Sequence, residues 1–461
     1  MKTNNPRLIT DWRPEDPDFW ENQGKPVAKR NLWISIPCLL LAFAVWQLYS
    51  VVAPRLTDIG FGLTDNQLFW LTALPGLSGA TLRIFYSFMV PIVGGRRWTA
   101  ISTLSLALPA FWLGIAVQDP GTPFWEFALI ALLCGFGGGN FASSMANISF
   151  FYPKHAQGTA LGLNAGLGNL GVSVMQFVAP AIITTGVLAF VFGSGQTPGE
   201  GGTIWLQNAA LVWVPFIVII SVIAWFGMND LATAQASFRD QAVIFRRKHQ
   251  WVMSLLYTAT FGSFIGYSAG FPMLIKLQFP AVDGLQFAFL GPMVGALIRP
   301  VGGWFADRFG GARVTFWNFV FMAACVFGVV AFLPVGNTAG NFWGFFAMFM
   351  LLFIATGIGN GSTFRMIPVI FHTLHGRWVP DDSDQAKDAA RKNANREAAA
   401  TLGFSSAIAA YGAFFIPKSY GTSIALTGAP TAALYGFAAF YVLCIGVTWW
   451  YYQRRNAEVP C

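Results

Sequence analysis

Two arginines stand out as residues that could bind a ligand, because each lies inside an apolar run. Arg83 ends the string GATLR at 79–83, and Arg299 ends the similar string GALIR at 295–299. A guanidinium keeps its charge and offers a planar fork of donors that matches two oxygens of a flat oxyanion. The pair therefore predicts a site for a small planar anion. Alternatively, each arginine could bind backbone carbonyls or face a cytoplasmic water cavity.

The two arginines belong to an internal repeat in which equivalent residue numbers differ by 216. Glycine pairs at 94–95 and 310–311 share this offset, as do Arg97 and Arg313, and so do Thr99 and Thr315. Seven identical positions without a gap indicate duplicated halves. Parallel duplicated halves are the arrangement of major facilitator transporters, whose substrate lies between the halves near the membrane midplane.

The composition indicates which elements position these arginines. Hydrophobic residues make up 55% of the 461 residues and charged residues only 10%, against about 25% charged in soluble proteins. We therefore expect an all-α polytopic membrane protein with about 12 transmembrane helices of about 20 residues each, in two pseudo-symmetric six-helix halves. The apolar runs lie at 32–53, 66–90, 98–118, 124–151, 157–188, 204–227, 251–275, 285–304, 314–334, 341–371, 398–420 and 431–452.

Polar segments between these runs predict the domain organisation. We expect an N-terminal segment at 1–31, a first half at 32–227, a linker at 228–250, a second half at 251–452 and a tail at 453–461. A second polar insert at 381–397 suits a short surface helix or a solvated loop. One set of connections carries 22 Lys and Arg residues, and the opposite set carries only Arg55, Lys276 and Lys418. Both termini are therefore expected in the cytoplasm, and the protein in the inner (plasma) membrane.

The charges inside the predicted spans are almost all positive. Besides Arg83 and Arg299, only Arg365 lies within a span, near a cytoplasmic end where its side chain could snorkel. None of the 20 acidic residues lies deep in a span. A proton relay needs titratable groups inside the spans, so the sequence favours exchange over proton symport. The titratable residues closest to the interior of the spans are Asp65, Glu126 and Glu397 at span ends, and His155, His249, His372 and His375 at or beyond cytoplasmic ends.

Other function classes find little support. The five cysteines are scattered without CxxC spacing, so we expect no metal, no cofactor and no disulfide framework. The GxGxxG string that begins at Gly166 lies inside an apolar helix and is no nucleotide site. No clustered basic face suggests nucleic acid, and the spans contain no arrangement of catalytic groups. We expect a monomeric, non-enzymatic protein that is embedded in the lipid bilayer.

Aromatic and small residues complete the predicted site. Tyr257 and Phe261 are four residues apart and should share a helix face. Phe141 follows Asn140 in another span. Small residues in GLNAGLGNLG at 162–171, with Gly162 and Gly166 spaced by four, allow close helix packing.

Longer strings resemble the nitrate/nitrite porters of the major facilitator superfamily, NarK type. They are DWRPEDP at 11–17, NFASSMANISFF at 140–151, GLNAGLGNLG at 162–171, YTATFGSFIG at 257–266 and FFIP at 414–417. The resemblance covers nearly the whole chain. It implies nitrate and nitrite as substrates, with Arg83 and Arg299 as the substrate arginines, Tyr257 as a hydrogen-bonding partner of the anion, Phe141 and Phe261 as ring walls, and Asn169 in the glycine-rich string.

The resemblance also implies residues that govern conformational change. These are the glycines Gly162, Gly166, Gly168 and Gly171, and the pair Asp307 and Arg308 in GGWFADRFGG at 302–311, which resembles the superfamily's loop motif for latching helices in one access state. The chain departs from the family pattern at Ala165, Ala409 and Ala413, where glycine is usual. Arg365 replaces an uncharged glutamine.

The predicted mechanism is nitrate/nitrite antiport by alternating access, with the anion clamped by the two arginines. Two unneutralised guanidinium groups repel one another, so an empty carrier should reorient slowly, and a bound anion should relieve the repulsion. Nitrate/proton symport is the alternative. An anion channel and a facilitator for small organic anions also remain open.

Overall fold

The computed structural model describes residues 7–186, 189–197, 202–234, 242–334, 339–379 and 383–461. The chain folds into two compact units. The first comprises 1–236 with the short segments 269–273 and 284–289, and the second comprises the remainder. The change of unit at 236 falls inside the predicted linker 228–250, of which 235–241 lie outside the described residues. The two short segments were predicted in the second half.

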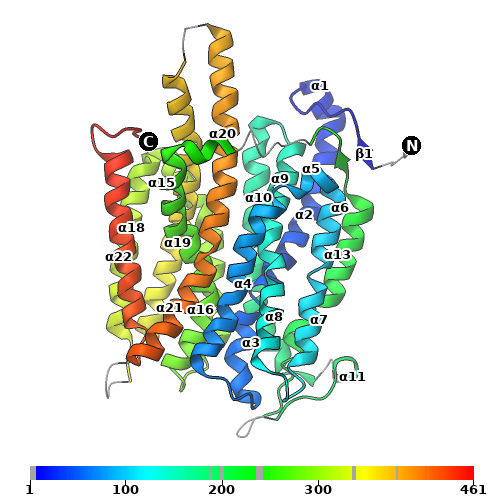
Figure 1. The fold of residues 1–461 in the computed structure, drawn as a ribbon, viewed down its shortest axis with the longest axis vertical. Helices are drawn as coiled ribbons and strands as arrows, with labels where there is room; N and C mark the ends of the chain where they lie inside the picture. Colours follow the sequence, from blue (N-terminus) through cyan, green and yellow to red (C-terminus); the bar gives the residue numbers. More distant parts are fainter. Residues whose placement is uncertain (1–6, 187–188, 198–201, 235–241, 335–338, 380–382) are drawn as a thin grey trace. The chain divides into compact units, whose positions relative to one another are not determined.

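In its described residues, the first unit consists mainly of helices and has one pair of two-residue strands (Figure 1). Its strands are β1 (Leu8–Ile9) and β2 (Asp230–Leu231), which pair in parallel. Its helices are α1 (Pro17–Phe19), η1 (Trp20–Gly24), α2 (Lys25–Trp46), α3 (Tyr49–Leu56), η2 (Thr57–Ile59), α4 (Asp65–Tyr86), α5 (Met89–Val93), α6 (Gly95–Leu104), α7 (Ala107–Ala116), α8 (Phe124–Cys134), α9 (Phe136–Phe151), α10 (Lys154–Ile183), α11 (Ala189–Phe192), α12 (Asn208–Leu211), α13 (Trp213–Gly227) and η6 (Gly284–Phe287).

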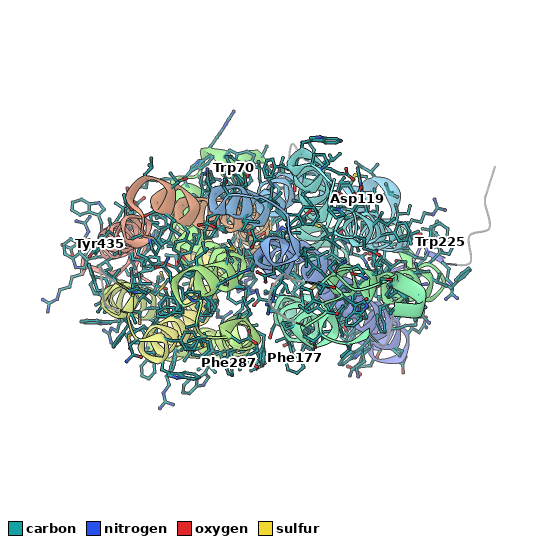
Figure 2. All side chains as sticks on the ribbon, turned by 90° about the horizontal axis from the view of Figure 1, so that it is seen from below. Trp70, Asp119, Phe177, Trp225, Phe287 and Tyr435 are labelled. Carbon is teal, nitrogen blue, oxygen red and sulfur yellow. The ribbon has the colours of Figure 1, made fainter. Side chains whose placement is uncertain are left out.

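The second unit contains the remaining helices, although residues 269–273 of α16 belong to the first unit. These helices are η4 (Ala242–Arg246), α15 (Lys248–Tyr257), η5 (Thr258–Gly262), α16 (Ser263–Gln278), α17 (Leu290–Phe309), α18 (Gly311–Phe332), α19 (Phe342–Arg377), α20 (Asp384–Ala410), α21 (Gly412–Thr427), α22 (Thr431–Thr448) and η7 (Trp449–Gln453). Side chains such as Tyr435 on α22 point outward from the unit (Figure 2).

The described residues contain eleven helices that are long and apolar enough to cross a membrane. The predicted span at 251–275 corresponds to a continuous helix formed by α15, η5 and α16, but this helix is not among the eleven. Its sequence TATFGSFIGYSAG at 258–270 mixes hydroxyl, small and aromatic residues, which lowers its hydropathy. The all-α polytopic fold is confirmed.

The repeat predicted from the sequence has an equivalent backbone geometry in each unit. Gly94 and Gly310, which precede α6 and α18, both adopt a positive φ, 100° and 90°, that only glycine takes without strain. In each helix, the backbone N–H of the second residue donates to an acceptor that lies beyond the last long helix of the same unit. Arg96 N–H donates to the Asp230 carboxylate at 2.9 Å, and Ala312 N–H donates to the Cys461 carbonyl at 2.9 Å.

The described parts of both predicted polar segments include regular secondary structure. The insert at 381–397 is neither a separate surface helix nor a solvated loop, because α20 runs without interruption from Asp384 to Ala410 and extends beyond the neighbouring helices of its unit (Figure 1). Ser383 caps it by accepting the Ala386 N–H at 3.2 Å, and its alanine, lysine and arginine residues favour helix. At the start of the predicted linker, strand β2 includes Asp230, which is buried.

Glu458 lies beyond the last helix of the second unit, and its ionic contacts should make the stability of the folded protein depend on pH. Its carboxylate accepts from Lys248 Nζ and lies 3.3 Å from His249 Nε2. The hydrogen bond from Lys248 is the main reason that the pKa of Glu458 lies below its ordinary value of 4.5. A lowered folded pKa gives stability that is present above the unfolded pKa and is lost as the pH falls through the folded value.

We therefore expect Glu458→Gln to destabilise the protein at pH 6 by less than about 1 kcal/mol, because the pair is partly exposed, and so to lower its thermal unfolding temperature slightly. The difference from the unmodified protein should begin to shrink as the pH falls below 4.5 and should vanish only below the lower pKa that Glu458 has in the folded protein. Thermal unfolding in detergent at a series of pH values measures this. A difference that persists unchanged at low pH would assign the effect to packing instead.

Candidate functional site

In the first unit, Arg83 contacts residues of two other helices, α2 and α9, that belong to the same unit. Its side chain is only 1% exposed. Nε donates to the Gly138 carbonyl at 2.8 Å, and Cζ lies 4.6 Å from the ring centroid of Phe141 and 5.1 Å from that of Trp46. Both distances are within the range of cation–π attraction. The guanidinium therefore has a fixed position and a largely aromatic surrounding.

Glycines explain why a backbone carbonyl can reach Arg83. Helices α4 and α9 cross at Gly79 and Gly138, where a Cβ on Gly138 would lie 2.7 Å from the Gly79 Cα and 2.7 Å from the Trp46 ring. Any side chain at Gly138 would push the helices apart and withdraw the carbonyl. Trp46 is anchored at the same crossing, since its indole N–H donates to the Pro75 carbonyl at 2.7 Å.

In the second unit, Arg299 has fewer and longer contacts. Its Nη2 donates to the Tyr257 hydroxyl at 3.4 Å, which is beyond the usual range for such bonds. Cζ lies 5.2 Å from the centroid of Phe364. Its buried Nη1 has no hydrogen-bond partner among the described residues. A buried guanidinium nitrogen without a hydrogen-bond partner is suited to receive an anion oxygen.

Tyr257 and Phe261 share a helix face, as predicted. Their rings stack with centroids 5.6 Å apart and planes 17° apart, although the segment between them is the π-helical turn η5 rather than regular α-helix. Both side chains are buried. Tyr257, which accepts from Arg299, also lies 6.5 Å from Phe364 between ring centroids. The structure thus brings these two predicted residues together with Arg299 in one unit.

Asn169 is the remaining predicted ligand residue. It lies buried in α10, and its Oδ1 has no hydrogen-bond partner among the described residues. Asn140, beside Phe141 on α9, donates to the Ser102 carbonyl at 3.3 Å, which gives it a packing role. The unsatisfied atom is a hydrogen-bond acceptor, whereas an anion needs donors, so Asn169 as an anion ligand stays a prediction that depends on its Nδ2.

Two residues that contact the arginines, and one buried polar residue of α19, were not predicted from the sequence. Trp46 and Phe364 flank Arg83 and Arg299, and Asn360 is a buried α19 residue whose Oδ1 has no partner in the described part of the chain. Only Asn360 carried a sequence signal, because the string GIGN at 357–360 resembles GGGN at 137–140. Nothing in the spacing distinguishes Trp46 or Phe364 from the other aromatic residues of the spans.

The glycine-rich helix α10 packs closely at different glycines from those expected. A Cβ on Gly162 or Gly166 would meet nothing within 4 Å, so the expected close approach at this pair is wrong. Gly168 and Gly171 make the contact instead, with their added Cβ atoms 2.6 Å from the Leu39 side chain and 2.0 Å from the Leu40 carbonyl of α2. The three positions with alanine, Ala165, Ala409 and Ala413, are all buried.

The corresponding crossing in the second unit uses Gly412. A Cβ on Gly412 would lie 2.2 Å from the Gly262 carbonyl, in the helix that corresponds to α2. Gly171 and Gly412 are therefore close-approach points against the first long helix of each unit. Ala409 takes part in this crossing, because a Cβ on Gly262 would lie 2.8 Å from its carbonyl oxygen.

Arg365 has a partner that the sequence did not reveal. Its Nε donates to the carboxylate of Asp307, in the predicted loop motif, and both side chains are more than half exposed. Arg308, the other charge of the motif, lies 5.5 Å from the centroid of Trp304. Arg365 therefore joins α19 to the end of α17 rather than standing alone in a span.

Glu397 is also buried in an ionic cluster of the second unit. Two bonds, 2.8 Å from Nε and 2.7 Å from Nη2, join Arg247 to its carboxylate, and His375 Nε2 lies 3.3 Å from it. The Trp378 ring covers the Arg247 guanidinium at 4.5 Å. The end of the predicted linker is thus tied to α20 and α19, and Glu397 has a structural partner.

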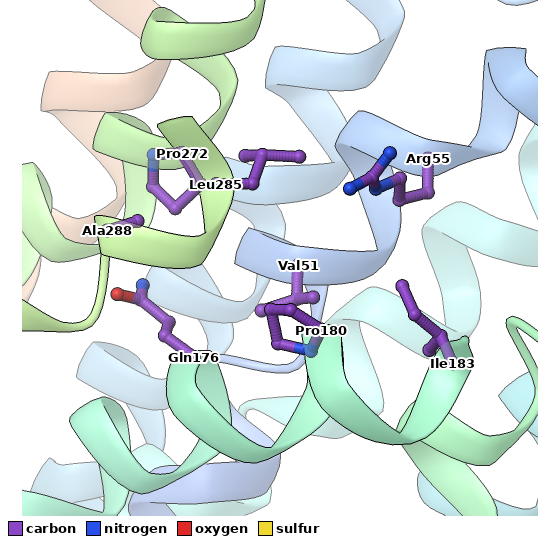
Figure 3. A pocket seen from close by; sticks show the side chains of 8 residues that line it. All are labelled: Val51, Arg55, Gln176, Pro180, Ile183, Pro272, Leu285 and Ala288. Carbon is purple, nitrogen blue, oxygen red and sulfur yellow. The ribbon is translucent and has the colours of Figure 1, made fainter. Parts of the chain in front are cut away.

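A small pocket in the first unit lies away from the predicted site residues (Figure 3). Its volume of about 10 Å³ has room for about one water molecule. Arg55 is its only charged lining residue, and Arg55 is 3.5 Å from Asp58. The complete lining consists of Val51, Arg55, Gln176, Pro180, Ile183, Pro272, Leu285 and Ala288.

Comparison with known proteins assigns the chain to a family. Residues 36–375 match the Major Facilitator Superfamily. The nitrate/nitrite transporter NarU of Escherichia coli (strain K12) is 56% identical over 456 residues, which cover 98% of each chain. The probable nitrate/nitrite antiporter NarK2 of Thermus thermophilus is 41% identical over 100% of both chains. These relatives are transporters, in agreement with the expectation of a non-enzymatic protein.

Among solved structures, the fold is similar to a bacterial homologue of the human lysosomal transporter Spinster in an inward-facing, unoccupied conformation. The TM-score is 0.60, the sequence identity is 16%, and the match covers 92% of this chain and 94% of the other. At that identity the likeness concerns the fold alone. The long, highly similar relatives and the superfamily match together establish that this chain belongs to the nitrate/nitrite porters, NarK type, of the major facilitator superfamily.

Proposed function

We propose that this protein exchanges nitrate and nitrite across the membrane and that Arg83 and Arg299 bind the transported anion. The observation that carries the proposal is the pair of repeat-related arginines, each placed among aromatic rings of its own unit. The names of the relatives from Escherichia coli and Thermus thermophilus support the choice of anions. Nitrate and nitrite are flat and carry one charge, which suits the planar donor fork of arginine.

Each proposed ligand group has a chemical role. Tyr257 accepts a hydrogen bond from Arg299, which leaves its hydroxyl proton available to an anion oxygen. Phe141 and Phe261 supply apolar walls that exclude water and strengthen the electrostatic attraction. Asn169 would donate from its Nδ2 to an anion oxygen. Gly162, Gly166, Gly168, Gly171, Asp307 and Arg308 are proposed to govern the change between access states.

Exchange is favoured over proton symport by the surroundings of the acidic residues. Glu397 and Asp307 are already engaged by Arg247 and Arg365, so neither is an isolated carboxylate that could carry a proton along the transport path. With both arginines charged and no anion bound, mutual repulsion opposes reorientation of the empty carrier. We also propose that the protein is monomeric, lies in the inner membrane and has both termini in the cytoplasm.

A counterflow assay tests the proposed function. Purified protein in liposomes should take up labelled nitrate rapidly when nitrate or nitrite is present inside, and at least about tenfold more slowly when the interior holds only a non-substrate anion. Trapped gluconate serves as the control interior. Rapid nitrate uptake into gluconate-loaded liposomes under an imposed inward proton gradient would contradict exchange and indicate nitrate/proton symport.

A further inference from the structure

The two arginines occupy equivalent positions of the repeat but differ in how firmly they are held. Arg83 is 1% exposed, is bonded through Nε to a backbone carbonyl at 2.8 Å and lies within 5.1 Å of two ring centroids. Arg299 is partly exposed, its Nη2 bond to the Tyr257 hydroxyl is 3.4 Å long, and its Cζ lies 5.2 Å from the centroid of one ring, that of Phe364. Sequence equivalence has therefore not produced equivalent surroundings.

The orientation of the Arg83 side chain depends on Trp46. Its ring covers the guanidinium, and its N–H bond to the Pro75 carbonyl fixes the orientation of the ring. The ring also packs on Gly79 and Gly138, the glycines whose crossing presents the Gly138 carbonyl to Arg83. Trp46 is 1% exposed, so the ring has little freedom to turn away. One side chain thus contacts the guanidinium and both glycines of the crossing that supplies its acceptor.

We infer that Trp46 is a positioning residue that holds Arg83 in a binding-ready orientation, so that Arg83 is the fixed partner of the anion and Arg299 the partner that reorients when the anion binds. The inference rests on the proposed function, because it assigns unequal roles within the same anion site. Preorganisation reduces the conformational entropy that is lost on binding. The loss of Trp46 should therefore weaken anion binding even though Arg83 keeps its charge.

The test is a comparison of nitrate exchange kinetics in proteoliposomes. We expect Trp46→Leu, which removes the ring, to raise the KM for nitrate about tenfold while Vmax per inserted protein stays within about twofold, as for the loss of a desolvated cation–π contact. Trp46→Phe, which keeps a ring but loses the N–H bond to Pro75, should raise KM about threefold. Phe364→Leu, beside Arg299, should change KM by less than about twofold because Arg299 reorients in any case.

Trp125→Leu is the matched control, since Trp125 lies in the same unit and is 64% exposed. The KM of this variant for nitrate should be unchanged.

An unchanged KM with a lower Vmax for Trp46→Leu would mean a merely structural role and would overturn the inference. If Trp46→Leu does not insert, an unchanged KM for Trp46→Phe overturns it instead. A Phe364→Leu effect as large as that of Trp46→Leu would refute the unequal roles. Absence of nitrate exchange by the unmodified protein would contradict the proposed function itself.

Discussion

Arg83→Lys and Arg299→Lys are each expected to reduce nitrate exchange at least about hundredfold, because a lysine keeps the charge but loses the planar fork of donors, and bonds to charged groups contribute about 1.5–3 kcal/mol each. At Arg83 the replacement also loses the Nε bond to the Gly138 carbonyl. At Arg299 it loses the buried Nη1 that has no other partner in the described chain. The measurement is counterflow uptake of labelled nitrate, normalised to inserted protein.

The sequence offers a matched control for these replacements. Arg97 and Arg313 are related by the same repeat, and both are exposed, with 49% of the Arg97 side chain accessible. Arg97→Lys and Arg313→Lys should exchange nitrate at rates close to those of the unmodified protein. If Arg83→Lys and Arg299→Lys insert normally and match these controls, the two arginines have structural roles and the proposed anion site is refuted.

Asp230→Asn is expected to destabilise the first unit by about 3–5 kcal/mol, since it removes one partner of a buried ion pair. Only 6% of the Asp230 side chain and 8% of the Arg96 side chain are exposed. One carboxylate oxygen accepts the Arg96 N–H at 2.9 Å, and the other accepts from Arg96 Nε at 3.2 Å. Asparagine keeps the shape but leaves the buried guanidinium without a counter-charge.

Thermal unfolding in detergent, followed by the loss of monodisperse protein, measures this effect. Asp11→Asn is the control, since 70% of the Asp11 side chain is exposed, and it should unfold at the normal temperature. Adding Arg96→Leu to Asp230→Asn should recover part of the lost stability, because the unpaired charge is then removed. Normal thermal stability of Asp230→Asn alone would show that this buried pair contributes little to holding β2 against α6.

Several features of the site follow from local sequence. Arg83 and Arg299 are recognisable because a charge in an apolar run is costly and therefore rare. The stacking of Tyr257 and Phe261 follows from a separation of four residues along one helix. The positive φ of Gly94 and Gly310 agrees with their equivalence in the repeat. Each of these predictions needs only the composition, the helical period or a comparison of two strings.

Other features depend on residues that are distant in the chain. Trp46 reaches Arg83 only because three helices cross at Gly79 and Gly138. The partner of Arg365 is Asp307, on a different helix. The close contact of α10 is made by Gly168 rather than Gly162, although both belong to the same string. Helical spacing shows that small residues share a face but does not show which neighbour that face meets.

By itself, the sequence determined the membrane-protein class, the duplicated halves, the two internal arginines and, through its resemblance to a family, the class of anion. The hydrophobicity of the spans and the internal repeat can be read from the amino-acid sequence, so these conclusions do not depend on how the helices pack. The tertiary structure decided how firmly each arginine is held, because a guanidinium's orientation depends on carbonyls and rings from other helices. Equal residues at equivalent positions therefore acquired unequal surroundings, with Arg83 fixed by a glycine crossing and Trp46, and Arg299 held by one longer bond to a side chain.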